Sequence, residues 1–219
     1  MALIFEKVKI VRNGDGKIEF DAYVMGKEGA PGIVVIQEWW GIDFEIKKHA
    51  TDIASKGYRA LIPDLYRGKV GLEVAEAQHL SQGLDWPGAV TDIAASAKWL
   101  KEHGSPKVGV TGFCMGGALS FASAVLVPGI DAVVAFYGTP PPQLADPTES
   151  KVPVQAHFGE EDTMMGLDKE IYPKVGHGFM NSSPEGIERN KALGFGEHHQ
   201  EAVNLAWSRF ESWFAKYLQ

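Results

Sequence analysis

The sequence predicts an α/β protein built on a mostly parallel, doubly wound sheet with an antiparallel hairpin at its N-terminal edge. Apolar runs bounded by turn residues alternate along the chain with amphipathic stretches, as strands alternate with covering helices. Several of these runs are continuous, as expected for strands buried on both faces. Residues 5–11 and 18–24 instead alternate in period two around Asn13-Gly14-Asp15-Gly16, which indicates a hairpin.

The N-terminal half continues with parallel elements. Residues 32–37 form a continuous apolar run, residues 44–56 have a helical pattern, and residues 58–62 form a second strand, which together predict a βαβ unit. A long helix is expected over 87–103, with Pro87 in its first turn, where proline is tolerated. Its apolar face consists of Ala89, Ile93, Ala97 and Leu100.

The C-terminal half repeats the alternation. The last helix is predicted from apolar residues at helical spacing, namely Leu205, Trp207, Phe210, Trp213, Phe214 and Tyr217. The expected elements are, in order, a strand at 107–111, a helix at 118–126, strands at 131–137, 153–158 and 170–172, and a helix at 203–218.

Length and composition indicate a single domain over residues 1–219. The chain is 45% hydrophobic and 22% charged, which is ordinary for a globular domain of this size. Charge appears within the first six residues, and no apolar run reaches the roughly 18 residues of a membrane span. We therefore expect a soluble, cytoplasmic protein, a monomer or a weak homodimer, that neither enters a membrane nor carries a signal peptide.

Charge and cysteine content narrow the function classes. The net charge is −7 and no Lys/Arg cluster follows a helix, so a nucleic acid is not an expected partner. The chain has one cysteine, which excludes an internal disulfide and a cysteine-based zinc site and suits a reducing compartment. The histidines lack metal-ligand spacing, and no phosphate-binding loop is evident, so neither a metal nor an organic cofactor is expected.

That single cysteine lies in Gly112-Phe113-Cys114-Met115-Gly116-Gly117, directly after a predicted strand. The pattern is G-x-S-x-G with a thiol in place of the hydroxyl, and such a strand-turn-helix exposes the central side chain. Gly112 and Gly116 are required because side chains there would clash in the sharp turn. A free cysteine is more often inert core packing, but the paired glycines favour a nucleophile.

Chain order then suggests the partners of this thiol. In this fold class the nucleophile precedes an acid, and the acid precedes a histidine. Asp162 follows the predicted strand at 153–158, although a solvated turn aspartate is an equally good reading of its position. His177 lies between Gly176 and Gly178, which allow close backbone approach and expose the ring. The predicted triad is Cys114, Asp162 and His177.

Five separate segments, which span nearly the whole chain, resemble the dienelactone hydrolase (carboxymethylenebutenolidase) family of α/β hydrolases. The segments are Ile36-Gln37-Glu38-Trp39-Trp40-Gly41, Ile62-Pro63-Asp64-Leu65-Tyr66, Gly112-Phe113-Cys114-Met115-Gly116-Gly117, His157-Phe158-Gly159-Glu160-Glu161-Asp162 and Tyr172-Pro173-Lys174-Val175-Gly176-His177-Gly178-Phe179. Their order along the chain matches the family, which makes the resemblance far more specific than the cysteine motif alone.

The resemblance implies Cys114 as nucleophile, His177 as base and Asp162 as the acid that orients it. It further implies an oxyanion hole formed by the backbone N–H groups of Met115 and Trp39. A role for Glu38 in forming the thiolate is also implied, and a buried carboxylate at a strand end must in any case be paired or neutral. The alternative for Glu38 is a salt bridge to an arginine such as Arg67.

The resemblance is incomplete at the substrate. Family members that act on dienelactone hold its carboxylate with arginines, one of them four residues after the histidine, where this chain has Asn181. A small ester or lactone is therefore expected as the substrate without further assignment. The candidate pocket residues, any one of which could instead be core, are Trp40, Tyr66, Arg67, Trp86, Phe113, Phe179 and Asn181.

The connection between the acid and the histidine is short. Only the 14 residues from Thr163 to Gly176 separate them, whereas a parallel crossover needs about a dozen residues besides its strand. Either the chain has lost a helix here or a stretch is missing from the sequence. We predict a spatial break between Thr163 and Lys169, wider than the roughly 3.8 Å between consecutive Cα atoms.

Together these features predict hydrolysis through a thioester acyl-enzyme. Two alternatives stay open: a non-catalytic ligand-binding protein of the same fold, and a redox sensor in which Cys114 reacts with peroxide.

Overall fold

The computed structural model describes residues 4–14, 16–162 and 171–219. The strands are β1 (Glu6–Gly14), β2 (Gly16–Met25), β3 (Gly32–Ile36), β4 (Arg59–Pro63), β5 (Val108–Phe113), β6 (Ala132–Phe136), β7 (Val154–Gly159) and β8 (Ile171–Tyr172). The helices are α1 (Phe44–Ser55), α2 (Val74–Gln82), α3 (Trp86–Glu102), α4 (Met115–Leu126), α5 (Pro184–Ala192) and α6 (Gln200–Leu218), with a 3₁₀ turn at Pro147–Glu149.

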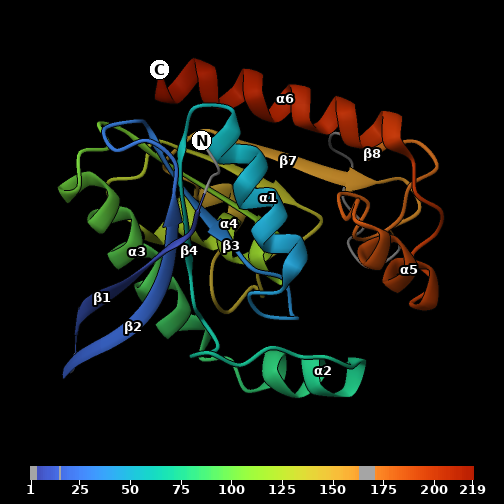
Figure 1. The fold of residues 1–219 in the computed structure, drawn as a ribbon, viewed down its shortest axis with the longest axis horizontal. Helices are drawn as coiled ribbons and strands as arrows, with labels where there is room; N and C mark the ends of the chain where they lie inside the picture. Colours follow the sequence, from blue (N-terminus) through green and yellow to red (C-terminus); the bar gives the residue numbers. More distant parts are fainter. Residues whose placement is uncertain (1–3, 15, 163–170) are drawn as a thin grey trace.

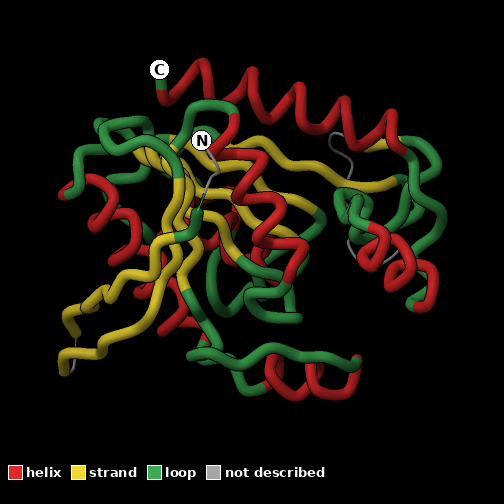
Figure 2. The backbone as a smooth tube through the Cα atoms, in the orientation of Figure 1, coloured by secondary structure: helices red, strands yellow, loops and turns green. Residues whose placement is uncertain are grey.

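The strands in the described part of the chain form one sheet in the order β1-β2-β4-β3-β5-β6-β7-β8 (Figure 1). β1, β2 and β4 pair antiparallel, and every pair from β4 across to β8 is parallel. The predicted fold class is confirmed, including the N-terminal hairpin, which projects beyond the rest of the sheet (Figure 2). β5 lies between β3 and β6, so whatever follows β5 lies at the middle of the sheet's carboxyl edge.

The apolar runs fill both faces of the sheet. In β3, Ile33 and Val35 pack into one core cluster and Val34 and Ile36 into another, because successive strand residues point to opposite sides. α1 and α6 cover the first face, where Phe210 and Phe214 of α6 are fully buried. α3 and α4 cover the second face. This two-sided burial explains why the parallel strands are continuous apolar runs.

The sequence-based prediction gives no bounds for two helices, although it places His79 of α2 on a helical stretch. α2 lies away from the sheet, below it in Figure 1, and of its residues only Ala77 is buried, so it has no apolar stripe to detect. α5 likewise buries only Gly186. Its start does carry a local signal, because Ser183 caps Gly186 N–H at 3.0 Å and Pro184 is the first helical residue.

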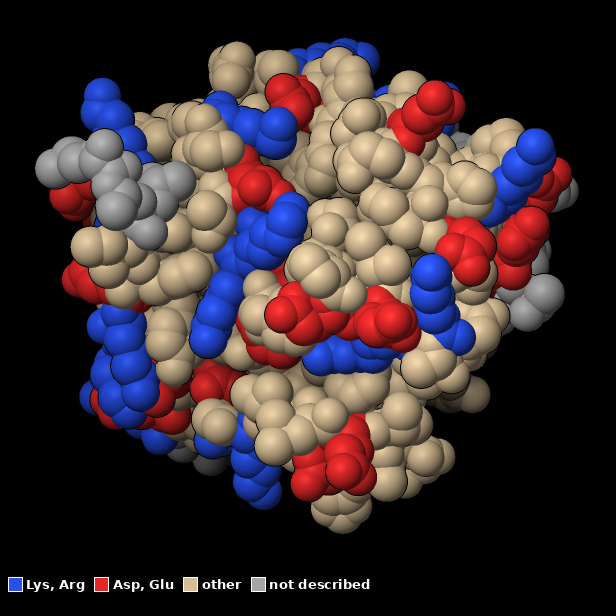
Figure 3. Space-filling view, turned by 45° about the vertical axis from the view of Figure 1, so that its right-hand side comes forward, with Lys and Arg blue, Asp and Glu red and all other residues tan. Residues whose placement is uncertain are grey.

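The predicted break between Thr163 and Lys169 lies outside the described residues. Within the described ranges, none of the helices has the length and apolar character needed to cross a bilayer. Acidic and basic side chains are interspersed over the face shown in Figure 3.

Candidate active site

The turn from β5 to α4 carries Cys114 in a conformation that L-residues rarely adopt, with φ 55° and ψ −116°. The residues two positions before and two positions after Cys114 must be glycine. A Cβ on Gly112 would lie 2.2 Å from the Gly116 carbonyl oxygen, and one on Gly116 would lie 2.4 Å from that of Ile36 in β3. The clash expected from the motif is therefore present at both positions, and the turn holds the partly exposed thiol at the edge of the sheet.

The end of β6 packs directly against this turn. A Cβ on Gly138 would lie 2.0 Å from the Cys114 carbonyl oxygen, so only glycine fits there. Cys114 N–H in turn donates to the Phe136 carbonyl at 3.0 Å. Tyr137, between these two contacts, has φ 37°, which is a second strained non-glycine residue beside the cysteine.

Asp162 and His177 meet where chain order predicts. Asp162 follows β7 through a turn in which its N–H donates to Gly159 at 3.2 Å. His177 Nδ1 lies 3.0 Å from Asp162 Oδ2, and both side chains are buried. Because an ionised carboxylate only accepts, Nδ1 carries the proton, which leaves Nε2 to face another group.

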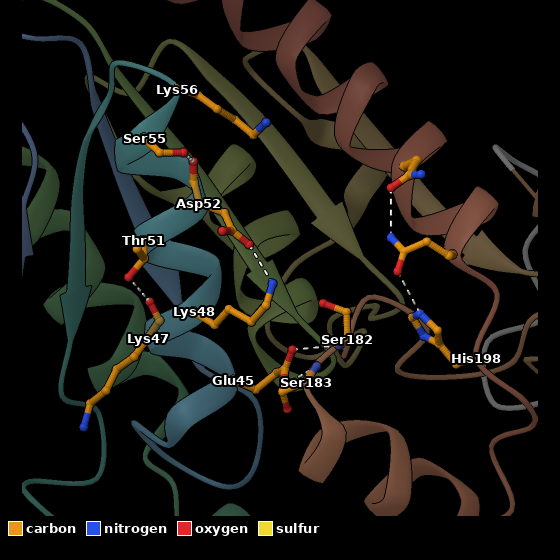
Figure 4. Close-up of polar contacts among 12 residues, drawn as sticks. Glu45, Lys47, Lys48, Thr51, Asp52, Ser55, Lys56, Ser182, Ser183 and His198 are labelled. Atoms are coloured by element: carbon orange, nitrogen blue, oxygen red, sulfur yellow. Dashed lines mark hydrogen bonds and ion pairs between the residues drawn. The ribbon is translucent and has the colours of Figure 1, made fainter. Parts of the chain in front are cut away.

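Contacts from α1 and α5 hold the segment that carries His177. Glu45, buried in the first turn of α1, accepts from Ser182 N–H at 2.8 Å and from Ser183 Oγ at 2.5 Å (Figure 4). Asn190 of α5 donates to the Gly178 carbonyl at 2.8 Å. The loop that carries His177 is thus held by contacts to both α1 and α5.

The ring of His177 adjoins the thiol. Both residues line the same cavity. Burial alone would lower the pKa of His177, but hydrogen bonds to Asp162 and Cys114 and the charges of both raise that pKa to about 10. Apart from the Cys114 thiol, Nε2 has no hydrogen-bond partner among the described residues, so the thiol is the group that this nitrogen faces.

Glu38, two residues after β3, is buried beside this pair. It accepts from Tyr137 Oη at 3.2 Å and from Asn181 Nδ2 at 3.3 Å. Burial, followed by the charge of Asp43, raises the pKa of Glu38 to about 7 although His177 and Asn181 lower it. The alternative pairing with Arg67 is wrong, because Arg67 binds Asp92 at 2.6 Å instead.

The cavity at Cys114 has a volume of about 290 Å³. Of the residues expected there, Trp39, Trp86 and Met115 line it together with Cys114 and His177. Its remaining described walls, which sequence reasoning missed, come from Ser81, Gln82, Ala118, Tyr137, Gly138 and Thr139. Tyr137 could have been found from its place at the carboxyl end of a strand beside the cysteine turn.

The other pocket candidates lie elsewhere. Trp40 packs edge-on against Trp39. The guanidinium carbon of Arg189 lies over the Trp40 ring, 4.1 Å from the ring centre. Tyr66 donates to Met115 Sδ at 3.3 Å and, like Arg67, lines a different cavity next to α3. The remaining three are buried away from the cavity: Phe113 between His49 and Phe136, Phe179 against Tyr137 and Tyr172, and Asn181 on Glu38.

The strand order and the strained turn that carries Cys114 at the centre of the sheet are those of the α/β-hydrolase fold. A model of the dienelactone hydrolase family matches residues 20–218, and the chain belongs to that family. It is accordingly a hydrolase of the esterase type.

Relatives support this assignment. Protein usf of Aquifex pyrophilus is 35% identical, over 74% of this chain and 81% of its own. The carboxymethylenebutenolidase of Pseudomonas putida is 29% identical, over 76% of this chain and 82% of its own.

Two crystal structures share the fold. A dienelactone hydrolase-like promiscuous phosphotriesterase from metagenomic libraries has TM-score 0.81 at 19% identity, covering 98% and 99% of the two chains. The dienelactone hydrolase from Anabaena variabilis has TM-score 0.66 at 20% identity, covering 99% of each.

Proposed function

We propose that this protein hydrolyses small carboxylic esters or lactones, with Cys114 as nucleophile, His177 as base and Asp162 as the acid that orients the base. The observation that carries the proposal is the contact among these three groups: Cys114 and His177 line one cavity, a strained turn exposes the thiol, and Asp162 holds His177 from behind through a hydrogen bond of 3.0 Å that leaves Nε2 for the thiol. This arrangement has the geometry of a nucleophile, a base and an orienting group.

Acylation begins with the thiolate. The raised pKa of His177 favours an imidazolium beside a Cys114 thiolate. The thiolate attacks the carbonyl carbon, and the carbonyl electron pair moves to the oxygen. The tetrahedral intermediate then collapses, the bond to the alcohol oxygen breaks, and His177 supplies the proton to the departing alcohol. The acyl group stays on Cys114 as a thioester.

Deacylation uses the same groups in reverse order. Neutral His177 takes a proton from water, the hydroxide oxygen attacks the thioester, and the carboxylic acid leaves as the thiolate re-forms. Asp162 keeps Nδ1 protonated throughout, so that Nε2 is the nitrogen that exchanges protons.

The oxyanion is stabilised by two backbone amides. Met115 is the first residue of α4, so its N–H has no partner within the helix and lies at the positive end of the helix dipole. Trp39 follows β3 next to the same turn, and both residues line the cavity with the thiol. Two donors so placed act on the charge that develops in the transition state.

Glu38 acts on the ionisation of the thiol. Its carboxyl is buried, interacts with the charge of His177, and has its pKa raised to about 7 by burial. At neutral pH such a group both releases and accepts a proton readily, which suits a residue that biases the thiol toward thiolate as substrate arrives.

The test is a hydrolysis screen over small lactones, aryl esters and thioesters. Wild type is expected to turn over members of these classes, whereas Cys114→Ala is expected to fall to the background rate. A protein that binds these compounds without turnover would be a ligand-binding member of the fold. One that cleaves none yet forms a sulfenic acid on Cys114 with peroxide would be a redox sensor.

A further inference from the structure

The cavity at Cys114 has a largely apolar wall in the described part of the chain. Trp39, Trp86, Met115 and Ala118 supply most of the wall. Of the described residues that line the cavity, none is a lysine or an arginine. His177 is the one titratable base among them, and its charge is already matched by Asp162 and the thiolate.

The groups behind this wall are acidic. Asp162 and Glu38 are buried next to His177, and the charges of Asp43 and Glu45 both act on Glu38. With a thiolate and an imidazolium in the site, the buried carboxyls leave the interior net negative. An anionic substrate in the cavity would therefore meet like charge.

The nearby arginines are engaged with other groups. Arg189 pairs with Asp43 at 2.7 Å and stacks on the ring of Trp40. Arg67 pairs with buried Asp92 at 2.6 Å and lines a separate cavity. Asn181, whose side chain donates to Glu38, is uncharged and adds no cation beside the site.

We propose that the cavity selects esters or lactones that are uncharged and carry an apolar or aromatic part, and that it discriminates against substrates bearing a carboxylate. This inference rests on the proposed ester hydrolysis. Trp39 and Trp86 provide flat surface for an aromatic part. Because no lysine or arginine is among the described residues that line the cavity, a carboxylate finds no cationic partner among them.

A matched pair of substrates tests the selectivity. 4-Acetoxybenzamide and 4-acetoxybenzoate have nearly the same shape and differ by one charge, and each rate is corrected for the ester's own hydroxide-catalysed hydrolysis. We expect kcat/KM for the amide to exceed that for the carboxylate by about tenfold or more, since like charges repel in such a site. Added salt should raise the carboxylate rate and leave the amide rate unchanged.

The two hypotheses fail differently. Equal efficiency on both esters, or preference for the carboxylate, would overturn the selectivity while leaving the hydrolase assignment intact. Turnover of neither ester, nor of any lactone or thioester in the screen, would contradict the proposed function and the selectivity with it.

A rim variant supplies a second measurement. Gln82 lies in the last turn of α2, is exposed, and lines the cavity, so its replacement does not disturb the core. Gln82→Lys should raise the carboxylate-to-amide ratio of kcat/KM by about tenfold through a new attraction, whereas the matched uncharged variant Gln82→Met should leave the ratio at the wild-type value. A ratio that both variants change equally, or neither changes, would contradict an electrostatic origin.

Discussion

At the scale of single residues, the site depends on backbone positions that no side chain can occupy. Cys114 is held at positive φ because Gly112, Gly116 and Gly138 let three backbone segments approach within a distance that excludes a Cβ. The resulting strain is of the order of 1–3 kcal/mol and must be balanced by the packing of β3, β5 and β6 around the turn.

Gly116→Ala should therefore destabilise the protein strongly. The added Cβ would lie 2.4 Å from the Ile36 oxygen and 2.6 Å from that of Gln37, and backbone cannot move aside as a flexible side chain can. We expect a loss of about 3 kcal/mol or more in the free energy of unfolding, measured by urea titration. Gly83→Ala is the control, since its φ is −85° and its nearest new contact is 3.5 Å. Equal effects of the two variants would refute the argument.

Glu38→Gln tests the acid beside the thiol. The variant keeps the shape and removes the charge, so kcat should fall about 10²-fold, the scale of an acid-base group, without loss of stability. Since the pKa of Glu38 is raised to about 7 by burial, wild-type kcat/KM should rise through pH 7 as the carboxyl ionises, and the variant should lose this inflection. The control is Glu28→Gln, the same change at a mostly exposed glutamate. Unchanged turnover in Glu38→Gln would reduce Glu38 to a structural role.

Sequence reasoning reached the residues of the site that carry a local signature. Gly112, Cys114 and Gly116 follow a motif, and His177 stands between glycines, so each is visible in the sequence. Tyr137 and Gln82 are not, because they reach the cavity only through strand order and the placement of α2. Composition alone does not separate pocket walls from core: Trp86 lines the cavity, whereas Phe113, also an aromatic candidate, is fully buried in the core.

At the scale of elements, α1 connects the sheet to the segment that carries His177. Its first turn supplies Glu45, whose buried carboxylate accepts from the backbone and side chain of the segment before α5 (Figure 4). Asp43, the residue that caps α1, pairs with Arg189 of α5 at 2.7 Å. Loss of these contacts should make the position of His177 less well defined, although none of them involves His177 itself.

Glu45→Gln tests this connection. The substitution replaces one acceptor oxygen by an amide nitrogen, which cannot accept a hydrogen bond. We therefore expect the free energy of unfolding to fall by about 1–3 kcal/mol, and kcat to fall as well. Asp52→Asn is the matched control on the same helix, because its partner Lys48 forms an exposed i,i+4 pair at 2.8 Å, worth about 0.5 kcal/mol or less. The connection would be dispensable if Glu45→Gln behaved like the control.

The elements themselves were predictable in proportion to what they bury. β3, β5 and α6 are apolar on the faces they bury, and their predicted limits agree with the structure to within a few residues. α2 and α5 bury one residue each, so the periodicity that identifies a helix is absent from them.

At the scale of the whole molecule, stability should depend on pH through three buried groups. His157 is buried and has its pKa lowered to about 3, by burial first and then by the charge of Arg209. The unfolded chain therefore takes up a proton at His157 below about pH 6.5 that the folded chain refuses, so stability falls from about pH 6.5 toward 3.

At alkaline pH, stability is lost because the folded chain must release protons or hold a buried charge. The pKa of His177 is raised to about 10, so between about pH 6.5 and 10 the folded chain holds a proton that the unfolded chain has released. The stabilisation from this proton is complete below about pH 6.5 and is lost as the pH rises toward 10. Glu38, with its pKa raised to about 7, destabilises the folded state progressively from about pH 4.5 to 7. Between about pH 4.5 and 6.5 the effects of His157 and Glu38 oppose each other, so urea unfolding should give a broad maximum near about pH 5 to 6. Stability should fall by several kcal/mol toward pH 10 and by less than about 1 kcal/mol at pH 4. A flat profile would contradict this.

The central claim is that Cys114 becomes acylated during turnover. The most direct measurement is intact-protein mass spectrometry of the enzyme quenched in acid within the first turnovers on 4-nitrophenyl acetate. We predict a species heavier by one acetyl group, mapped by peptide analysis to Cys114, absent from Cys114→Ala and lost again when the substrate is exhausted. Ester turnover with no acyl group on Cys114, or an equal rate in Cys114→Ala, would contradict the assignment of the nucleophile.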